Sequence, residues 1–395
     1  MMTLRRILFL GLKLPKDVAN GFRFLSSAST SAAVKVNSMI ELCQLDKAAE
    51  ISRLAVLDRY RSNDSVFISN GIIGAMCGAK RYEEAIALFH YFFNESNVVP
   101  NMVSFNHIIK AHFEENRVEE ALQLFHHANN RGFDPDHETY RILTKGLVNA
   151  GRVHDAVGIV DGADHLLCDS TVYSYLIRGF LDQGNHDKAD QLFNRMSEEL
   201  YDYDDIALVD ATFVDYWFRQ GNDEKAMEIY NNKDGEKFMS ATTGNTLLKI
   251  LLDNGKKSEA WELFDEMINN TTYDGLLGAK RRTFDSETFN IMVNECFKLG
   301  NFTKAMETFV LGASFGASGY SNIIERFCER GMMSEAEGLF EEMCSRKDMV
   351  LSSEIPILRS MIKGFVKVGR VDDAQLMLKK MVDASVLKVA IHKAD

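Results

Sequence analysis

The chain has 395 residues and is acidic, with 45 Lys and Arg against 57 Asp and Glu and a formal net charge of −12 at pH 7. Hydrophobic residues form 46% of the chain, enough to bury a sizeable core, and a total of four prolines argues against a loop-rich or all-β protein. The six cysteines include no CxxC pair and no apolar run reaches roughly 18 residues, which argues against a disulfide framework, a zinc site and a membrane span.

The N-terminal segment 1–25 differs from the rest, because it holds five basic residues and one acidic residue. A Ser/Ala tract follows at 26–33, and an Arg-rich, Ser-rich, acid-poor start is typical of organelle transit peptides. The stretch 23–27 (RFLSS) is similar to a plant mitochondrial cleavage site, with the cut after Leu25. A secretory signal is the alternative, although two lysines interrupt its apolar run. We predict a mitochondrial transit peptide at 1–25 and a matrix protein whose mature net charge is −16.

An amphipathic helical pattern recurs along the remaining chain. Val118, Ala121, Leu122 and Phe125 follow the spacing i, i+3, i+4, i+7, which places them on one face of a helix. The alanine of this pattern recurs with a period of about 35 residues and marks a close contact between helices. These alanines are Ala85, Ala121, Ala156, Ala189, Ala226, Ala260, Ala305, Ala336 and Ala374.

A glycine precedes most of these helices and follows another apolar-periodic helix. Glycine in this place supplies the left-handed residue that closes a helix C-terminus. The glycines are Gly151, Gly184, Gly221, Gly255, Gly300, Gly331 and Gly369. The unit is therefore helix, glycine turn, helix and short loop. Because one such hairpin cannot bury its apolar face alone, the sequence predicts an all-α, right-handed solenoid of about ten helix-turn-helix repeats of about 35 residues.

The repeat resembles a known family. The stretch 116–125 (NRVEEALQLF), followed by GFDPD at 132–136, is similar to the pentatricopeptide repeat. The tetratricopeptide repeat is the alternative at 34 residues, but its W…LG…Y signature is missing here. A degenerate first repeat at 29–65 and a tail at 390–395 flank nine predicted repeats of the P class. Their bounds are 66–101, 102–136, 137–169, 170–206, 207–240, 241–285, 286–316, 317–354 and 355–389.

One repeat, 241–285, carries about ten additional residues around 271–282. Insertions in solenoids lie in loops on one face, and the run KRR at 280–282 makes this one basic. We expect a solvated loop, with a contact to RNA or a partner protein as the alternative.

The sequence contains no recognisable catalytic constellation. His107, His112, His126 and His127 are its densest histidines, but no HExxH motif or nearby cysteine makes them a metal site. The glycines form neither a GxGxxG motif nor a P-loop. We expect a protein that is not an enzyme, with no cofactor, no metal, no small-molecule substrate and no membrane attachment.

The resemblance implies single-stranded RNA as a partner, with each repeat recognising one base through its fifth and last residues. The implied pairs lean toward pyrimidines: Asn70 with Asn101, Asn106 with Asp136, Asn245 with Asp285, and Ser174 with Asp205 if one boundary shifts by a residue. Asn290 is the fifth residue of a repeat whose last residue, Gly316, departs from the pattern, as does the pair Arg141 and Asp169.

The thirteenth residue of a repeat is implied to face phosphate. It is basic at Arg219, Lys298 and Lys367, but acidic at Glu114, Asp182, Asp253 and Glu329. An acid facing a phosphate repels it, so we expect RNA contacts that are weak or confined to part of the groove.

Two functions remain open at this point. The first is a non-catalytic adaptor in mitochondrial RNA metabolism that binds single-stranded RNA. The second is a structural or protein-binding scaffold associated with mitochondrial ribosomal or RNA-processing proteins. Family resemblance favours the adaptor, while the acidic charge favours the scaffold.

Overall fold

The computed structural model describes residues 32–57, 62–96, 98–163, 169–199, 203–231, 239–269, 271–273, 280–312, 317–345 and 354–391. The predicted transit peptide at 1–25, Cys168, Gly316 and residues 392–395 of the predicted tail lie outside these residues. The chain divides into two compact units, one made of residues 100–291 and the other of 1–99 with 292–395.

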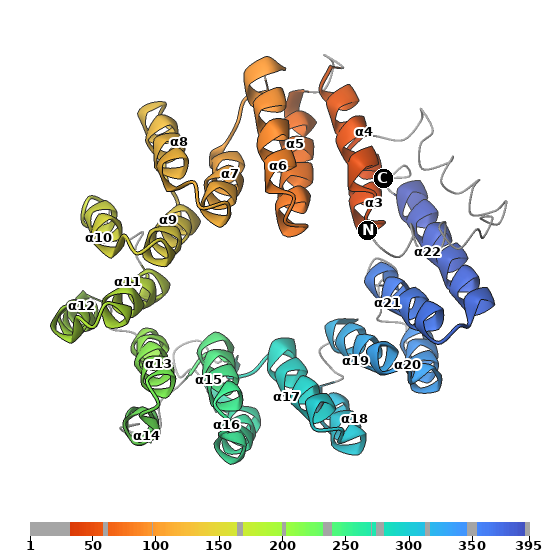
Figure 1. The fold of residues 1–395 in the computed structure, drawn as a ribbon. Helices are drawn as coiled ribbons and strands as arrows, with labels where there is room; N and C mark the ends of the chain where they lie inside the picture. The colour runs from red at the N-terminus through yellow and green to blue at the C-terminus, as the bar shows by residue number, and fades with distance from the viewer. Residues whose placement is uncertain are drawn as a thin grey trace. The chain divides into compact units, whose positions relative to one another are not determined.

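The unit of residues 100–291 is a stack of helical hairpins. Its first helices lie side by side along the inner face of the unit, and its second helices lie behind them (Figure 1). The first helices are α7 (Met102–Glu114), α9 (His137–Asn149), α11 (Ser170–Asp182), α13 (Tyr203–Arg219) and α15 (Ala241–Asp253). The second helices are α8 (Val118–Asn130), α10 (Val153–Asp161), α12 (His186–Glu199), α14 (Asp223–Asn231) and α16 (Lys257–Asn269). The following helix, α17 (Ser286–Lys298), includes the division between the units.

The other unit consists of hairpins from both ends of the chain. Its N-terminal helices are α3 (Ala32–Glu41), α4 (Leu45–Leu57), α5 (Ser62–Gly78) and α6 (Tyr82–Phe89), continued by a π-helical turn η1 (His90–Glu95). Its C-terminal helices are α18 (Phe302–Gly312), α19 (Ala317–Arg330), α20 (Met333–Ser345), α21 (Glu354–Lys367) and α22 (Val371–Ile391). Within this unit α22 contacts α3, and Arg359 donates a hydrogen bond to the carbonyl oxygen of Glu41.

The helix-forming signals in the sequence act as expected. All nine recurring alanines are at most 1% exposed, because each sits where two helices meet. All seven glycines after first helices have φ between 70° and 80°, the left-handed conformation of a helix C-cap. Three earlier hairpins close without glycine, with Cys43 at φ 55°, Lys80 at φ 57° and Asn116 at φ 58°. The all-helical fold predicted from these periodic signals is confirmed.

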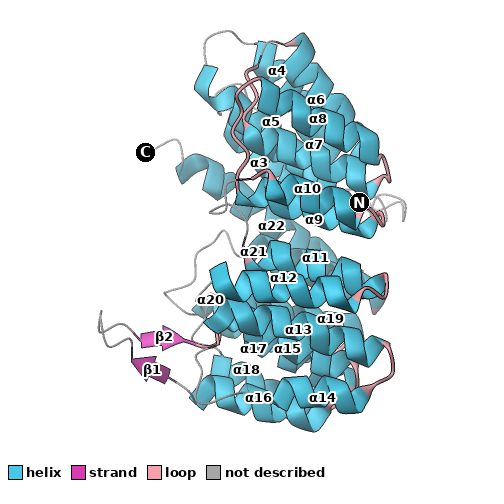
Figure 2. Cartoon of the chain, turned by 90° about the vertical axis from the view of Figure 1, so that its left-hand side faces the viewer, coloured by secondary structure: helices cyan, strands magenta, loops and turns pink. Residues whose placement is uncertain are grey.

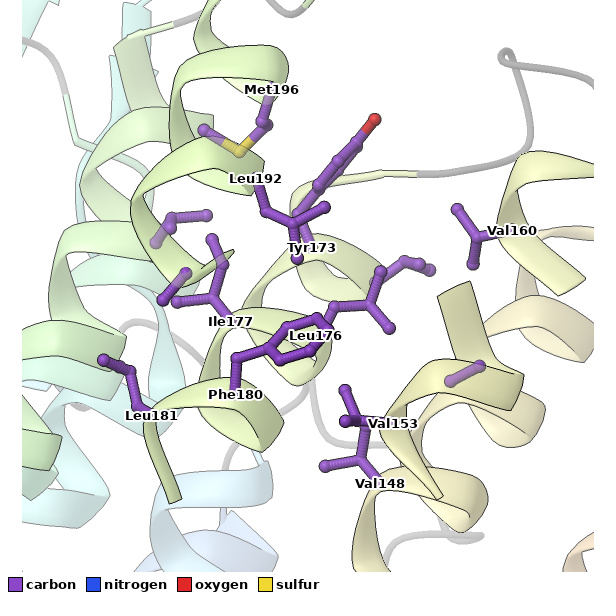
Figure 3. Close-up of a cluster of buried hydrophobic side chains, with 14 of the residues drawn as sticks. Val148, Val153, Val160, Tyr173, Leu176, Ile177, Phe180, Leu181, Leu192 and Met196 are labelled. Carbon is purple, nitrogen blue, oxygen red and sulfur yellow. The ribbon is translucent and has the colours of Figure 1, made fainter. Parts of the chain in front are cut away.

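The core runs between the two layers of helices. Around α11 it is formed by Leu176, Ile177 and Phe180, which pack against Val153 of α10 and Met196 of α12 (Figure 3). Each of these side chains is at most 2% exposed, and burying a side chain of this size contributes about 1.5–3 kcal/mol. Because every hairpin shares its apolar face with its neighbours, the position of a first helix depends on the hairpins on both sides.

The inserted segment departs from the predicted loop. It contains two short antiparallel strands, β1 (Thr271–Tyr273) and β2 (Lys280–Arg282), with Thr271 opposite Arg282 (Figure 2). An insertion cannot extend the helical stack, so its backbone groups pair with each other. The residues at 274–279 that connect the strands lie outside the described part of the chain.

Candidate nucleic-acid interface

Side chains one helical turn apart form three rows across the first helices of residues 100–291. Residues at i, i+4 and i+8 share one helix face, so equivalent positions on neighbouring helices line up. The first row holds Asn106, Arg141, Ser174, Ala211 and Asn245. The second row holds Lys110, Lys145, Arg178, Asp215 and Lys249. The third row holds Glu114, Asn149, Asp182, Arg219 and Asp253.

In the first row, Asn106 of α7 is bonded to the start of α9. Its Nδ2 donates to Asp136 Oδ1 at 3.1 Å, and its Oδ1 accepts from Thr139 Oγ1 at 2.9 Å. Burial alone would raise the pKa of Asp136, but hydrogen bonds from Thr139 and Asn106 outweigh it and hold the pKa below its ordinary value. Asn106 is 6% exposed, so the side chain is held in place and does not stand free in a groove.

The same arrangement recurs at Asn245 of α15. Its Nδ2 donates to Asp285 Oδ1 at 3.0 Å, and Asp285 accepts from the backbone N–H of Thr288 at 3.0 Å. Burial would raise the pKa of Asp285, but the hydrogen bonds from Asn245 and Thr288 lower it. One difference separates the two pairs: the buried Oδ1 of Asn245 has no hydrogen-bond partner. The structure therefore brings both predicted Asn–Asp pairs together.

Four predicted repeats end on a residue that also caps the next first helix. Asn101 forms a capping box with Ser104, and Asp136 forms one with Thr139. Asp169 accepts from two backbone N–H groups of α11, and Ser240 caps α15. Asn, Asp and Ser are the preferred residues at such N-caps. The residue types that suggest base recognition thus also have a structural role. Asp136 has both roles, because it caps α9 and also accepts a hydrogen bond from Asn106.

The two irregular pairs behave differently. Arg141 forms an ion pair with Asp169, so no amide is presented there. Ser174 does not meet Asp205, because Asp205 accepts from the Oγ of Ser170 at 2.5 Å. The buried Oγ of Ser174 has no hydrogen-bond partner.

The remaining predicted residues are distributed over both units. Asn70 is half-buried on α5, and Asn290 is buried on α17. Three basic residues of the third-row position are engaged: Arg219 with Asp182 at 3.1 Å and Asp215 at 2.9 Å, Lys298 with Glu295 at 3.6 Å, and Lys367 with the carbonyl oxygen of Glu329 at 2.5 Å. One of the acids expected to repel phosphate, Asp182, therefore neutralises one of the basic residues expected to attract it, Arg219.

The second row contains basic residues that the sequence analysis did not single out. Lys110, Lys145 and Arg178 lie on the adjacent helices α7, α9 and α11. The ring of Tyr175 lies near two of them, with its centroid 5.8 Å from Lys145 Nζ and 5.6 Å from Arg178 Cζ. A cavity of about 270 Å³ opens beside them, lined by α7, α9 and Tyr175. A search for basic residues at the ninth position of each repeat would have found this group.

In the described part of the chain, no three His, Cys, Asp or Glu side chains are grouped so as to hold a metal ion. None of the helices in that part of the chain has both the length and the hydropathy to cross a bilayer. The five cysteines whose positions are described are free thiols, and burial raises the pKa of the Cys328 thiol to about 12.

Comparison with known proteins shows where such a stack occurs. Residues 100–149 match the PPR repeat family, and 171–199, 245–271, 287–311, 319–347 and 358–386 match the PPR repeat. A mitochondrial pentatricopeptide repeat-containing protein of Arabidopsis thaliana is 37% identical over 371 residues, which cover 88% of each chain. A second Arabidopsis protein of this kind is 45% identical over 139 residues, 33% of this chain and 14% of that protein. The pentatricopeptide repeat protein PPR10, solved with an 18-nt psaJ RNA element, aligns with 86% of this chain and 57% of its own at 17% identity and a TM-score of 0.38.

Proposed function

Because the chain belongs to the pentatricopeptide repeat family, we propose that it is a non-catalytic adaptor of mitochondrial RNA metabolism that binds single-stranded RNA with pyrimidine-leaning selectivity. The observation that carries the proposal is the repeated Asn–Asp bond, Asn106 with Asp136 and Asn245 with Asp285. Two pairs with the same bond at the same position of separate repeats indicate a site built to one plan.

The amide chemistry supports base recognition. An asparagine amide has two N–H donors and one carbonyl acceptor, and in both pairs Asp takes one of the donors. The second N–H and the carbonyl then form a donor–acceptor pair that complements the O4 and N3–H edge of uracil. Unstacked bases of single-stranded RNA are recognised on such edges.

The two pairs should differ in how readily they accept a base. At Asn245, Oδ1 has no partner, so a base N–H can take it while Nδ2 keeps its bond to Asp285. At Asn106, Oδ1 already accepts from Thr139, and a base N–H must compete with that bond. We therefore propose that the repeat containing Asn245 contributes more to base selectivity, while Asn106 mainly positions the first row.

The remaining parts of the proposal follow from the sequence. We propose import into the matrix through residues 1–25, nine repeats between 66 and 389, and further base contacts by Asn70, Asn101, Ser174 and Asn290. Fusing residues 1–40 to a fluorescent reporter should send it to mitochondria, and replacing Arg5 and Arg6 together by Ala should weaken import. A reporter that stays in the cytosol or is secreted would refute the transit peptide.

A filter-binding titration of the full chain with U-rich, C-rich and A-rich RNA at two salt concentrations tests the adaptor function. Losing a side-chain contact to a base costs about 1–3 kcal/mol, so Asn245→Ala should weaken a U-rich ligand about five- to a hundred-fold. Thr246→Ala is the matched control, because the Thr246 hydroxyl bonds the Thr242 carbonyl of the same helix.

A scaffold is the alternative favoured by the acids of the third row and by the net charge of −12. Wild-type protein that shows no RNA affinity at low salt, yet co-purifies with ribosomal or RNA-processing proteins after nuclease treatment, would decide for the scaffold.

A further inference from the structure

We propose that Lys110, Lys145 and Arg178 form a phosphate-binding track for single-stranded RNA, one helical turn from the first row and not at the third row. This inference rests on the proposed RNA-binding function and specifies where the RNA backbone runs. The three side chains occupy equivalent positions on α7, α9 and α11, which pack against one another in sequence order. Neighbouring helix axes are about 8–10 Å apart, so the track offers one cation per helix along the stack.

No ion pair with another described residue neutralises the charges of the track. Within the described residues, Lys110, Lys145 and Arg178 form no ion pair. Lys249 occupies the same position on α15, but its Nζ lies 3.0 Å from Glu287. Asp215 occupies it on α13 and is paired with Arg219. Three uncompensated cations on adjacent helices of a chain with a net charge of −12 therefore point to an anionic ligand.

The nearby acids have other partners or lie further away. Asp169 and Glu138 are both engaged with Arg141, the second at 3.9 Å. Glu114 lines the same cavity one turn beyond Lys110, without an ion pair to the cations in the described structure. Arg141 also lines the cavity, but its charge is balanced by its ion pairs with Asp169 and Glu138.

Tyr175 holds two of the cations together. Its ring centroid lies 5.8 Å from Lys145 Nζ and 5.6 Å from Arg178 Cζ, both within cation–π range. Arg178 also donates to Asn149 Oδ1 at 2.7 Å. Two like charges near one ring repel each other, and a phosphate beside them removes that repulsion. The adjacent cavity of about 270 Å³ provides space for it.

The track also gives the acidic third row a role. Glu114 lies one turn beyond the track, and an acid repels phosphate. The RNA backbone would then be confined to the strip between the first and third rows, close to Asn106. In this way an acidic protein can hold RNA over a short region.

The test is fluorescence anisotropy of the full chain with a labelled U-rich single-stranded RNA, over salt concentrations from about 50 to 200 mM. Each lost phosphate contact should lower the slope of log K against log salt by about 0.7, and at 0.1 M salt this corresponds to about five-fold in affinity. The triple variant Lys110→Ala, Lys145→Ala, Arg178→Ala should therefore lose about two units of slope and bind all sequences more weakly.

Matched variants separate the track from general effects of charge. Lys249→Ala removes the same charge from the same helix position. It should leave the slope of log K against log salt unchanged, because Lys249 is already paired with Glu287. Tyr175→Phe keeps the ring and should bind like the wild type, whereas Tyr175→Ala should weaken binding. Circular dichroism verifies that each variant is folded.

The outcomes distinguish this inference from the proposed function. If Asn245→Ala weakens RNA binding while the triple variant keeps wild-type affinity and slope, the track is wrong and the RNA adaptor stands. If wild-type protein binds no RNA at low salt, the proposed function fails with it. The wild type could instead bind a labelled poly-Glu peptide and no RNA, and the triple variant could lose that peptide binding. This outcome would assign the cations to an acidic peptide and overturn the track.

Discussion

Replacing Asn106 by Ala should destabilise its hairpin contact more than replacing Asn245 by Ala does. Asn106→Ala removes a bond to the Asp136 carboxylate and a bond from Thr139 Oγ1. A net contribution of at least about 0.5 kcal/mol from the neutral bond and at least about 1.5 kcal/mol from the charged one gives a loss of about 2 kcal/mol or more. The single hydroxyl proton of Thr139 then turns to Asp136 Oδ1, which lies 2.7 Å from Thr139 Oγ1, so no donor is orphaned.

Asn245→Ala removes the equivalent bond to Asp285 but also removes a buried oxygen that has no partner. Burying an unsatisfied polar atom costs about 1–3 kcal/mol, which offsets the lost bond and brings the net change close to zero. The carboxamide volume lost is the same at both sites. We therefore expect a difference of about 2 kcal/mol between the two variants, equivalent to about 30-fold in a local opening constant.

Native-state hydrogen exchange measures this difference where it arises. The amides of 137–149 should exchange about 30-fold faster in Asn106→Ala, while those of 286–291 should change little in Asn245→Ala. Local exchange is preferable to a single melting temperature, because the hairpins of a repeat protein need not open together. Equal effects at the two sites, or a larger effect at Asn245, would refute the assignment of the unpartnered oxygen.

Three further predictions concern the glycine turns, the loss of stability at low pH and the reactivity of the thiols. Gly151→Ala should destabilise by about 1–2 kcal/mol because its φ is 75°, whereas Gly158→Ala in helix α10 should stabilise by about 0.5–1 kcal/mol in chemical denaturation. The stabilising effect of ionised Asp136 is present above its ordinary pKa of 3.8 and is lost as pH falls through its lowered folded pKa, so α9 should lose exchange protection in acid; Asp136→Asn should show a smaller dependence. Alkylation near pH 8 should label exposed Cys344 in the native protein and buried Cys328 after unfolding, and equal native rates would contradict this.

The fold was predictable because its determinants are local and repeated. Each alanine and each glycine has the same packing or dihedral requirement in every hairpin, so periodicity alone locates both. The hairpins closed by Lys80 and Asn116 show that stacking also stabilises turns without glycine. The strands β1 and β2 were not predicted, because pairing within an insertion depends on backbone contacts that have no period.

The candidate site was predictable only in part, because spacing identifies a position and not its partners. Asn106 and Asn245 were expected at the first row, but their hydrogen bonding differs. The Thr139 hydroxyl contacts Asn106 Oδ1, whereas the equivalent Thr288 hydroxyl donates to Asp285 and leaves Asn245 Oδ1 unpartnered. Arg219 looked available to phosphate until the structure placed Asp182, from the preceding first helix, beside it. The sequence of a single repeat cannot show that a basic residue is neutralised by an acidic residue of the neighbouring hairpin.

Charge and selectivity are linked in this arrangement. A uniformly basic groove binds any RNA through its phosphates and gains little from correct bases. Here, in the described part of 100–291, the uncompensated cations of the second row are limited to Lys110, Lys145 and Arg178, so their non-specific attraction stays small. The base contacts at Asn106 and Asn245 would then form a larger fraction of the binding free energy. Because phosphate binding is weak, a small number of recognition residues can discriminate between RNA sequences.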